Sequence, residues 1–589
     1  MAVELTLVRM KLALLRHSRE GKQGAMTSTG AALGVVLAGG TLWLSVSGDA
    51  GALAAAYAVW MLGWTLGPVV MGGGDESLRP EHFSLAGLKA HRLAGGLLAA
   101  AFVGTAPLVG LAALLGLAVS GGREGVAGLL TAVPAIVLQL ALFVLLSKVA
   151  VGLLGLALRS RLGAIGAGLI NGAVLAAGCQ IWVFLAAFDQ SGVPAAVWLL
   201  PSGWGLLAVR GDLAALAALA VLDLLLLAAW TVLLSRRSGA PRTSGRPRRS
   251  IAARGAGGAV AAKELRTWSR DLARNHQFVF ALSFGVCFAA APLIIGWDGM
   301  LPAAGPIFVV MAASMTSNLY GTDGTALWLT LLTPDGDDVR GRQHAWLAVI
   351  APAALVITVV TTAIAGGRWP LVLALLPALL GGAAGLVPLL SVYGLIPGTD
   401  PARRGGNPLR VSDDSGGLTG LAYLMLALVA ATGVPAGLVA SSYGWAGVPT
   451  GTATGLLCYW ALGRLAGHRL RARGPELLQT MRTGRRPGTA SRLASLPRHR
   501  QAVAWTGFGL GAVPLFPQGV VAGILVANGF ERHTWFLATY MPPGLRWPVV
   551  TGMILLGLTT YGMAFLQARR AGLAANHPRS LRARRPAPH

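Results

Sequence analysis

The sequence predicts an all-α polytopic membrane protein, and three observations support this prediction. Of the 589 residues, 54% are hydrophobic and only 12% are charged, about half the charged fraction of a typical soluble protein. The apolar residues form long uncharged runs, and a helix of about 20 such residues crosses the hydrocarbon core of a bilayer. The runs do not alternate with the period of two that a membrane barrel requires. The composition therefore excludes a soluble enzyme, a disordered protein and an outer-membrane barrel.

About fourteen runs are long and apolar enough to be transmembrane helices. They lie near 26–47, 52–72, 93–119, 127–150, 162–186, 213–235, 277–296, 301–319, 345–366, 369–396, 418–441, 446–463, 502–527 and 547–568. The two groups of six are separated by a long polar segment, and a further pair follows. The sequence thus predicts a 6 + 6 + 2 arrangement.

These spans and the polar segments between them divide the chain into six regions. Residues 1–235 form a first six-helix half, 236–258 a flexible basic cytoplasmic linker, 259–470 a second six-helix half, 471–501 a basic cytoplasmic linker, 502–568 an additional pair of helices, and 569–589 a basic cytoplasmic tail. The first linker is rich in Arg, Pro, Gly and Ser, a composition typical of flexible segments.

The distribution of basic residues predicts the orientation of the chain. With the N-terminus inside, 42 of the 48 Lys and Arg residues fall in cytoplasmic segments and 5 in outside loops. This asymmetry follows the positive-inside rule. We therefore expect a multi-pass protein of the cell membrane with both termini in the cytoplasm. The net charge of +26 is explained by topology, so we expect no nucleic-acid partner.

A short basic segment precedes each six-span half, at 3–19 and 260–274. In each segment apolar residues recur at helical spacing while Lys and Arg lie on the other side. The stripes are Val3, Leu7, Met10 and Leu14 in one segment, and Ala261, Leu265, Trp268 and Leu272 in the other. Such helices lie in the headgroup layer of the lipid bilayer, although a basic connector without fixed structure is the alternative.

The loop after the second span of each half carries charges of both signs. Topology alone requires only Lys and Arg, whereas polar pairs of both signs fix the register of a protein partner. We therefore predict that these loops dock a partner protein, the alternative being ordinary solvated charges. The candidate docking residues are Asp75, Glu76, Arg79 and Glu81 in the first half, and Asp337, Asp338, Arg340 and Arg342 in the second.

Two ionisable residues lie inside predicted spans, Asp223 and Lys148. A charge near the bilayer centre costs several kcal/mol, so such residues face protein or water. Both are candidates for a substrate or ion path. The alternatives are a structural, protonated or paired Asp223 and a Lys148 that reaches the cytoplasmic surface along its alkyl chain.

The motifs of common catalytic sites are absent from the sequence. There is no GxxxxGK[ST] phosphate loop, HExxH or GxSxG, and Cys179, Cys287 and Cys458 have no metal-binding spacing. We therefore expect no catalytic, cofactor or metal site in this chain and no ATPase activity of its own.

Several of these segments resemble one family, the permease subunits of type-2 ATP-binding-cassette (ABC) exporters in their long duplicated actinobacterial form. The motifs are KELRTWSRD at 263–271, GTDGTALW at 321–328, DVRGR at 338–342 and DESLRPEHF at 75–83. With the 6 + 6 topology, the resemblance covers residues 1–470. The first loop departs from the family pattern, which favours an acidic residue at Arg79 and a proline near Gly87.

The resemblance implies a partner and an energy source. An amphipathic helix would lead into each half, and the loop after each second span would dock on a separate ABC ATPase, in two copies, which binds ATP and Mg. It also implies export of an apolar or amphipathic substrate, whether a small molecule, a lipid or a peptide. The identity of that substrate, the role of the last two helices and whether one chain forms the whole pathway stay open.

Two other classes compete with this interpretation. A proton-coupled secondary drug transporter can have fourteen spans and would use an intramembrane acid such as Asp223. That class usually carries a Gly-x-x-x-Asp-Arg-x-Gly-Arg-Arg loop after its second span, which residues 74–82 do not match. A polytopic membrane enzyme is the third possibility, and it lacks a convincing catalytic loop.

Overall fold

The computed structural model describes residues 2–18, 22–70, 83, 90–157, 160–237, 252–332, 337–397, 415–483, 507, 511–527, 529 and 536–576. Within these ranges the chain is helical and contains no strand. Ten of the described helices are long and apolar enough to cross a membrane. These findings confirm an all-α polytopic membrane protein, while the count of fourteen and the 6 + 6 + 2 arrangement stay predictions.

The described helices occur in the following order along the chain. In the first half they are α1 (Ala2–Ser18), α2 (Lys22–Ser47), α3 (Ala50–Val70), α4 (Ala90–Ala101), α5 (Thr105–Arg123), α6 (Val126–Ala157), α7 (Arg161–Cys179), α8 (Ile181–Ser191), α9 (Pro201–Val209) and α10 (Leu213–Arg237). In the second half they are α11 (Gly255–Arg270), α12 (Leu272–Ala290), α13 (Ala304–Met315), the 3-10 helix η5 (Tyr320–Ala326), α14 (Leu327–Leu331), α15 (Asp337–Ala365), α16 (Trp369–Tyr393), α17 (Ser415–Tyr443) and α18 (Gly447–Thr483). The last pair comprises α20 (Ala512–Leu515), a π-helical turn (Phe516–Val521), α21 (Ala522–Ala527) and α22 (Pro543–Asn576).

Two spans predicted as continuous are each broken into two helices. The run at 93–119 is interrupted between α4 and α5, where Gly104 has a positive φ of 159°. The run at 162–186 is interrupted at Gln180, between α7 and α8. The side-chain amide of Gln180 donates a hydrogen bond of 2.9 Å to the carbonyl oxygen of Phe288. Hydropathy does not register either break, because the residues around it remain apolar.

The basic segment at 260–274 is also divided, so the expectation of one helix over that range is wrong at its end. Asp271 adopts an extended conformation, and its side chain accepts a hydrogen bond from the backbone N–H of Ala273. This N-cap starts a new helix, so Leu272 belongs to α12 and not to the apolar stripe of α11.

Contacts divide the chain into two compact units. The first comprises residues 1–8, 41–102 and 114–487, and the second comprises 9–40, 103–113 and 488–589. The first unit has a large core formed by α12, α13, α15 and α16, with Phe308 and Trp346 among its buried side chains. A smaller core in the same unit surrounds Tyr57 and Phe143. In the second unit, α20 packs against α22, and a Cβ placed on Gly557 would lie 2.5 Å from the Cβ of Leu515.

Within the first unit, α7 of the first half packs along α12 of the second. A Cβ on Gly172 would lie 2.4 Å from the carbonyl oxygen of Phe280, so only glycine permits this approach. Polar groups of α7 and α12 also contact each other. Asn171 Nδ2 and His276 Nε2 are 3.2 Å apart, and Ser283 Oγ donates to the carbonyl oxygen of Leu169 at 2.7 Å.

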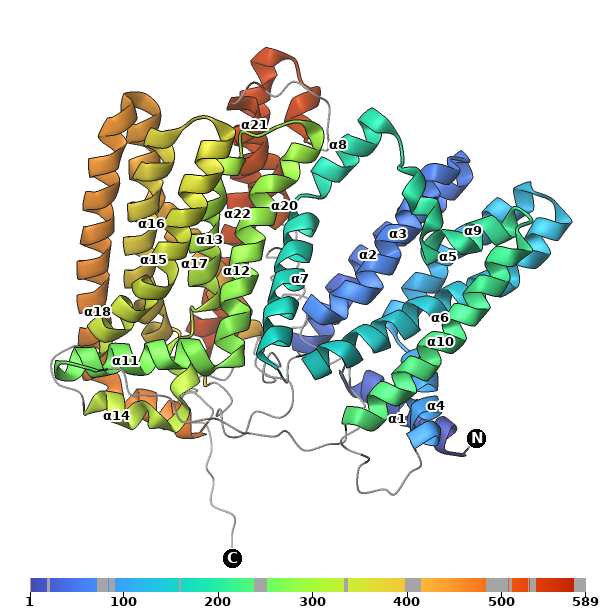
Figure 1. The fold of residues 1–589 in the computed structure, drawn as a ribbon, viewed down its shortest axis with the longest axis horizontal. Helices are drawn as coiled ribbons and strands as arrows, with labels where there is room; N and C mark the ends of the chain where they lie inside the picture. Colours follow the sequence, from blue (N-terminus) through green and yellow to red (C-terminus); the bar gives the residue numbers. More distant parts are fainter. Residues whose placement is uncertain are drawn as a thin grey trace, which may run out of the picture. The chain divides into compact units, whose positions relative to one another are not determined.

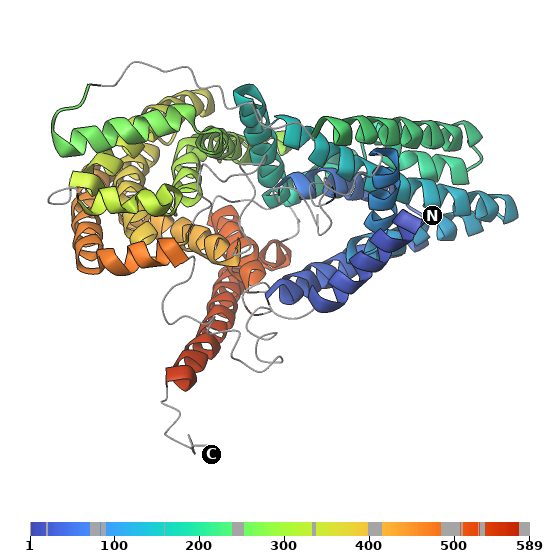
Figure 2. The ribbon, with the colours of Figure 1, turned by 90° about the horizontal axis from the view of Figure 1, so that it is seen from below.

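The basic helix α11 lies across one end of the bundle formed by α12, α13 and α15–α18, and α14 lies at the same end (Figure 1). Seen from that end, α11 runs along the edge of this group of helices, at the upper left of the view (Figure 2). The segment between the second and third spans of this half is therefore brought against the helix that precedes the first. This arrangement positions the site described next.

Candidate functional site

The side chain of Arg342, in the first turns of α15, is the centre of a buried ion cluster. Its exposed fraction is 1%. Its Nε donates to Asp338 Oδ2 at 2.9 Å, its Nη1 donates to Glu264 Oε1 at 2.8 Å, and its Nη2 donates to Asp323 Oδ2. A guanidinium group has five N–H donors in a fixed planar fork. Arg342 uses that fork to hold three carboxylates at once.

The three carboxylates come from three separate elements. Glu264 lies on α11, Asp323 on η5 and Asp338 on α15 itself. The cluster consequently joins α11, the loop after the second predicted span and the start of the third. Removing one member of a buried ion pair typically costs about 3–5 kcal/mol, because the remaining charge stays buried without its partner.

Tyr320 and Thr330 complete the cluster. The Tyr320 hydroxyl donates to Asp338 Oδ2 at 2.7 Å, and the Arg342 guanidinium lies 4.2 Å from the centre of the Tyr320 ring. Burial, followed by the negative charge of Asp338, raises the pKa of Tyr320 well above its ordinary value. The phenol therefore stays a neutral hydrogen-bond donor.

Lys263 closes the exposed side of the cluster. Its Nζ is 2.8 Å from Asp323 Oδ1 and 3.1 Å from Glu264 Oε1. Burial acts to raise the pKa of Asp323, but the positive charges of Arg342 and Lys263 outweigh it, and the net pKa is lowered. Asp323 is therefore ionised at neutral pH and contributes a full negative charge.

An exposed apolar surface lies directly beside this cluster. Within α14, Leu327 and Thr330 face inward, and Thr330 Oγ1 is 3.4 Å from Arg342 Nη2. The outward side chains of Trp328, Leu329 and Leu332 are 49%, 55% and 72% exposed. We call these three residues the α14 patch. On the other side of α14, Leu331 packs against Gly474 of α18.

The structure places the predicted docking residues in different environments. Asp338 and Arg342 are buried and bind each other, so their side chains are held inside the chain. Arg340 is exposed, Asp337 is the first residue of α15 and its side chain is not described. Asp75, Glu76, Arg79 and Glu81 lie outside the described residues.

The two predicted intramembrane residues lie on different helices of the first half. Asp223 is on α10, is 7% exposed, and neither of its carboxylate oxygens has a hydrogen-bond partner among the described residues. Lys148 is on α6 and is half-buried. The structure does not place either residue in a described cavity.

Sequence reasoning missed Glu264, Asp323 and Tyr320 as members of the site. One signal was present: Glu264 is an acidic residue beside the apolar stripe of a basic helix, which implies a buried cationic partner. Asp323 and Tyr320 offered no comparable signal, because a loop sequence does not reveal which side chains turn inward. The α14 patch was also missed, although Trp328 ends the GTDGTALW motif.

The charged groups of the cluster are paired with one another. Its three carboxylates are occupied by Arg342 and Lys263. Among the described residues, no group of three or more His, Cys, Asp or Glu is placed to hold a metal ion. Comparisons with protein-family models, with curated proteins and with solved structures found no match to this chain.

Proposed function

We propose that this chain is the transmembrane permease of an ABC exporter, which moves an apolar or amphipathic substrate out of the cell. A separate ATPase, in two copies, binds ATP and Mg and supplies the energy. The chain resides in the cell membrane with both termini in the cytoplasm, and it has no ATPase activity of its own. The substrate is a small molecule, a lipid or a peptide.

The observation that carries the proposal is the α14 patch. Exposed aromatic and aliphatic side chains on a polar loop mark protein interfaces, and Trp is enriched among the residues that dominate binding energy. The patch follows the second span of its half, on the side to which the basic residues assign the cytoplasm. A cytoplasmic ATPase is the partner that fits this position, while the exposed Arg340 supplies a charge beside the patch.

The ion cluster explains how a partner at α14 could move the transmembrane helices. Thr330 of α14 and Asp323 of η5 both contact Arg342, and Arg342 also binds Glu264 of α11. A displacement of the loop is therefore passed to the interfacial helix and to the third span together. Asp338 and Arg342 thus act by holding the docking surface in place, and Trp328, Leu329 and Arg340 make the contact.

Affinity purification from the native host tests this proposal. Tagged wild-type chain should co-purify an ATPase that carries a phosphate loop, identified by mass spectrometry. Trp328→Ala with Leu329→Ala should strongly reduce the recovered ATPase and the transport, with membrane insertion unchanged. The matched control is Trp445→Ala, an exposed tryptophan in the turn between α17 and α18, which should have no effect.

This experiment distinguishes a wrong proposed function from a wrong docking surface. Failure of the wild-type chain to recover any phosphate-loop ATPase would overturn the proposed function. Equal losses from the α14 pair and from Trp445→Ala would leave the function standing but remove the docking surface.

A proton-coupled secondary transporter is a second candidate, favoured by the single observation that Asp223 is buried with no hydrogen-bond partner among the described residues. Intramembrane acids of that kind carry protons in many transporters. In that case transport would depend on Asp223 and on the proton gradient, and it would not require an ATPase.

A further inference from the structure

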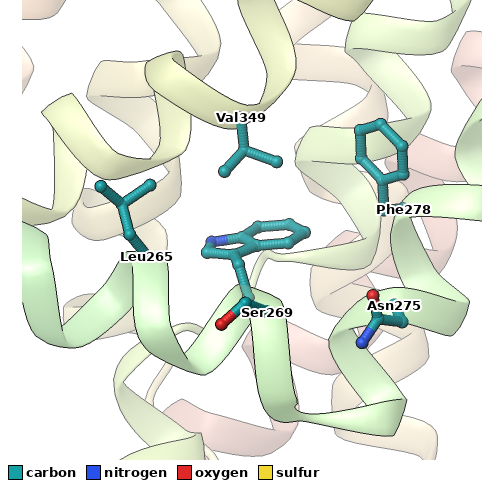
Figure 3. A pocket seen from close by; sticks show the side chains of 6 residues that line it. Leu265, Ser269, Asn275, Phe278 and Val349 are labelled. Atoms are coloured by element: carbon teal, nitrogen blue, oxygen red, sulfur yellow. The ribbon is translucent and has the colours of Figure 1, made fainter. Parts of the chain in front are cut away.

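A cavity lies between the interfacial helix and the first and third spans of the second half. Its volume is about 240 Å³, and it is partly open to its surroundings. It is lined by Leu265, Trp268 and Ser269 of α11, Asn275 and Phe278 of α12, and Val349 of α15. Figure 3 shows Leu265 and Phe278 on opposite sides, with Val349 above and Ser269 and Asn275 below.

The lining favours an apolar occupant. Four of the six side chains are apolar. The two polar ones already have partners: Ser269 Oγ donates to the carbonyl oxygen of Arg266 at 2.8 Å, and Asn275 Nδ2 donates to that of Asp271 at 3.0 Å. The Ser269 hydroxyl and the Asn275 amide nitrogen therefore need no hydrogen bond from a ligand. The volume is also below the ~300 Å³ of the smallest usual drug-sized pockets, which favours a segment of a flexible chain.

The position of the cavity indicates where its apolar occupant comes from. α12 and α15 include segments apolar enough to span a membrane, and α11 lies across their ends (Figure 1). A cavity at the junction of an interfacial helix and two spans lies at the depth where lipid acyl chains begin. Acyl chains are the apolar groups present there in large excess.

The charges beside the cavity indicate the kind of lipid. Residues three or four apart are neighbours on a helix surface, so Arg266 and Arg270 form a stripe next to the cavity-lining Leu265 and Ser269. Arg270 is exposed and Arg266 is half-buried. The one acidic side chain of α11, Glu264, is turned inward to Arg342. Asp271, which follows Arg270, is half-buried and caps α12. The two arginines exceed this single carboxylate, so the net accessible charge beside the cavity is positive and complements an anionic headgroup.

We propose that this cavity binds one acyl chain of an anionic phospholipid from the leaflet in which α11 lies. Arg266 and Arg270 contact its phosphate, and Leu265, Trp268, Phe278 and Val349 surround the chain. The lipid holds α11 against α12 and α15 next to the ion cluster. The site requires only that the protein is in a membrane, so it is independent of the proposed ATPase.

Photolabelling of the full chain tests this site. The protein is placed in phosphatidylcholine nanodiscs with a small fraction of phosphatidylglycerol that carries a diazirine in one acyl chain, and labelled peptides are mapped. We expect labelling concentrated at 265–278 and around Val349, competed by unlabelled phosphatidylglycerol more effectively than by phosphatidylcholine. Val349→Trp fills the cavity and should abolish this labelling. Leu265→Trp fills it from α11 and serves if the first variant does not insert.

Matched controls separate the site from general lipid contact. Leu355→Trp, at an exposed position of α15, should leave labelling unchanged. Arg266→Gln and Arg270→Gln should each reduce the preference for phosphatidylglycerol by about fivefold, whereas Arg471→Gln and Arg482→Gln on exposed parts of α18 should not. Labelling that is spread evenly over the spans, or that survives both tryptophan variants, would overturn the site. Equal competition by phosphatidylcholine, or full competition by soluble glycerol phosphate, would overturn its specificity for an anionic lipid.

Discussion

Arg342 and Glu264 are 78 positions apart in the sequence, yet Nη1 of one lies 2.8 Å from Oε1 of the other. Both side chains are buried, and the pair joins the helix before the second half to the start of its third span. Asp323, from the loop between them, binds the same guanidinium group. Three segments that are separate in the sequence are thus joined by one cluster of ion pairs.

Loss of the Arg342 charge should destabilise this unit severely. Arg342→Met leaves Glu264, Asp323 and Asp338 buried without their shared cation, and we expect the free energy of unfolding to fall by about 3–5 kcal/mol. Thermal unfolding of the purified protein in detergent measures the loss as a lower melting temperature. Arg340→Met, two residues earlier at an exposed position, should change stability by about 0.5 kcal/mol or less. Similar shifts in both variants would show that the cluster does not stabilise the fold.

Acid should weaken the same cluster through Asp323. Its pKa is lowered in the folded protein because Arg342 and Lys263 outweigh burial. The folded state therefore binds this proton less readily than the unfolded state does. Its stabilising contribution is fully present above the ordinary carboxyl pKa of about 3.9 and is lost as the pH falls through the lowered folded value.

Comparison of Asp323→Asn with the wild type isolates this effect. The difference in unfolding midpoint between the two proteins should be constant near neutral pH and shrink as the pH falls below about 4. When both proteins also carry Lys263→Met, which removes the cation at the rim, the difference between their unfolding midpoints at neutral pH should be smaller. A difference that grows on acidification would contradict the lowered pKa.

Substitution of Asp223 distinguishes a structural acid from a proton carrier. The buried carboxylate has no hydrogen-bond partner among the described residues, so an apolar side chain at this position would avoid the cost of burying it. If the permease proposal is right, Asp223→Asn retains transport with an unchanged pH profile, and Asp223→Leu raises thermal stability. Loss of transport and of its pH dependence in Asp223→Asn, measured with an imposed proton gradient, would instead support the secondary transporter.

Cysteine labelling tests the predicted orientation. Single cysteines are introduced into a chain in which Cys179, Cys287 and Cys458 are replaced by Ala, and intact cells are treated with an impermeant maleimide. Positions in 187–212 and 528–546 should be labelled, because those loops are predicted to lie outside. Position 245, in the basic linker, should be labelled only after the cells are opened. Labelling at 245 in intact cells would refute the span assignment.

The sequence alone determined the class of this protein, because that class depends on properties that are local in the chain. Uncharged runs predict helices that cross a membrane wherever they occur, and the structure confirms the all-α class. The basic stripe at 260–274 likewise predicted a helix, and α11 covers Gly255–Arg270, since amphipathicity is set by spacing within a few turns. At Asp271, Gln180 and Gly104 a cap or a turn ends one helix and begins the next. Hydropathy does not register such breaks, so the sequence predicted one continuous helix at each position.

Only the tertiary structure decided which charged residues are buried. Asp338 and Arg340 are two positions apart in a charged loop, and composition does not separate them. Asp338 is turned inward because Arg342 balances its charge there and the Tyr320 hydroxyl donates a hydrogen bond to it, while Arg340 remains in solvent. Glu264, Asp323 and Arg342 became a site through contacts between distant segments, and the apolar face of α14 became a surface because Thr330 and Leu331 anchor its other side. Burial of a charge depends on the partners that folding brings to it. The order of residues along the chain does not show which distant residues those partners are.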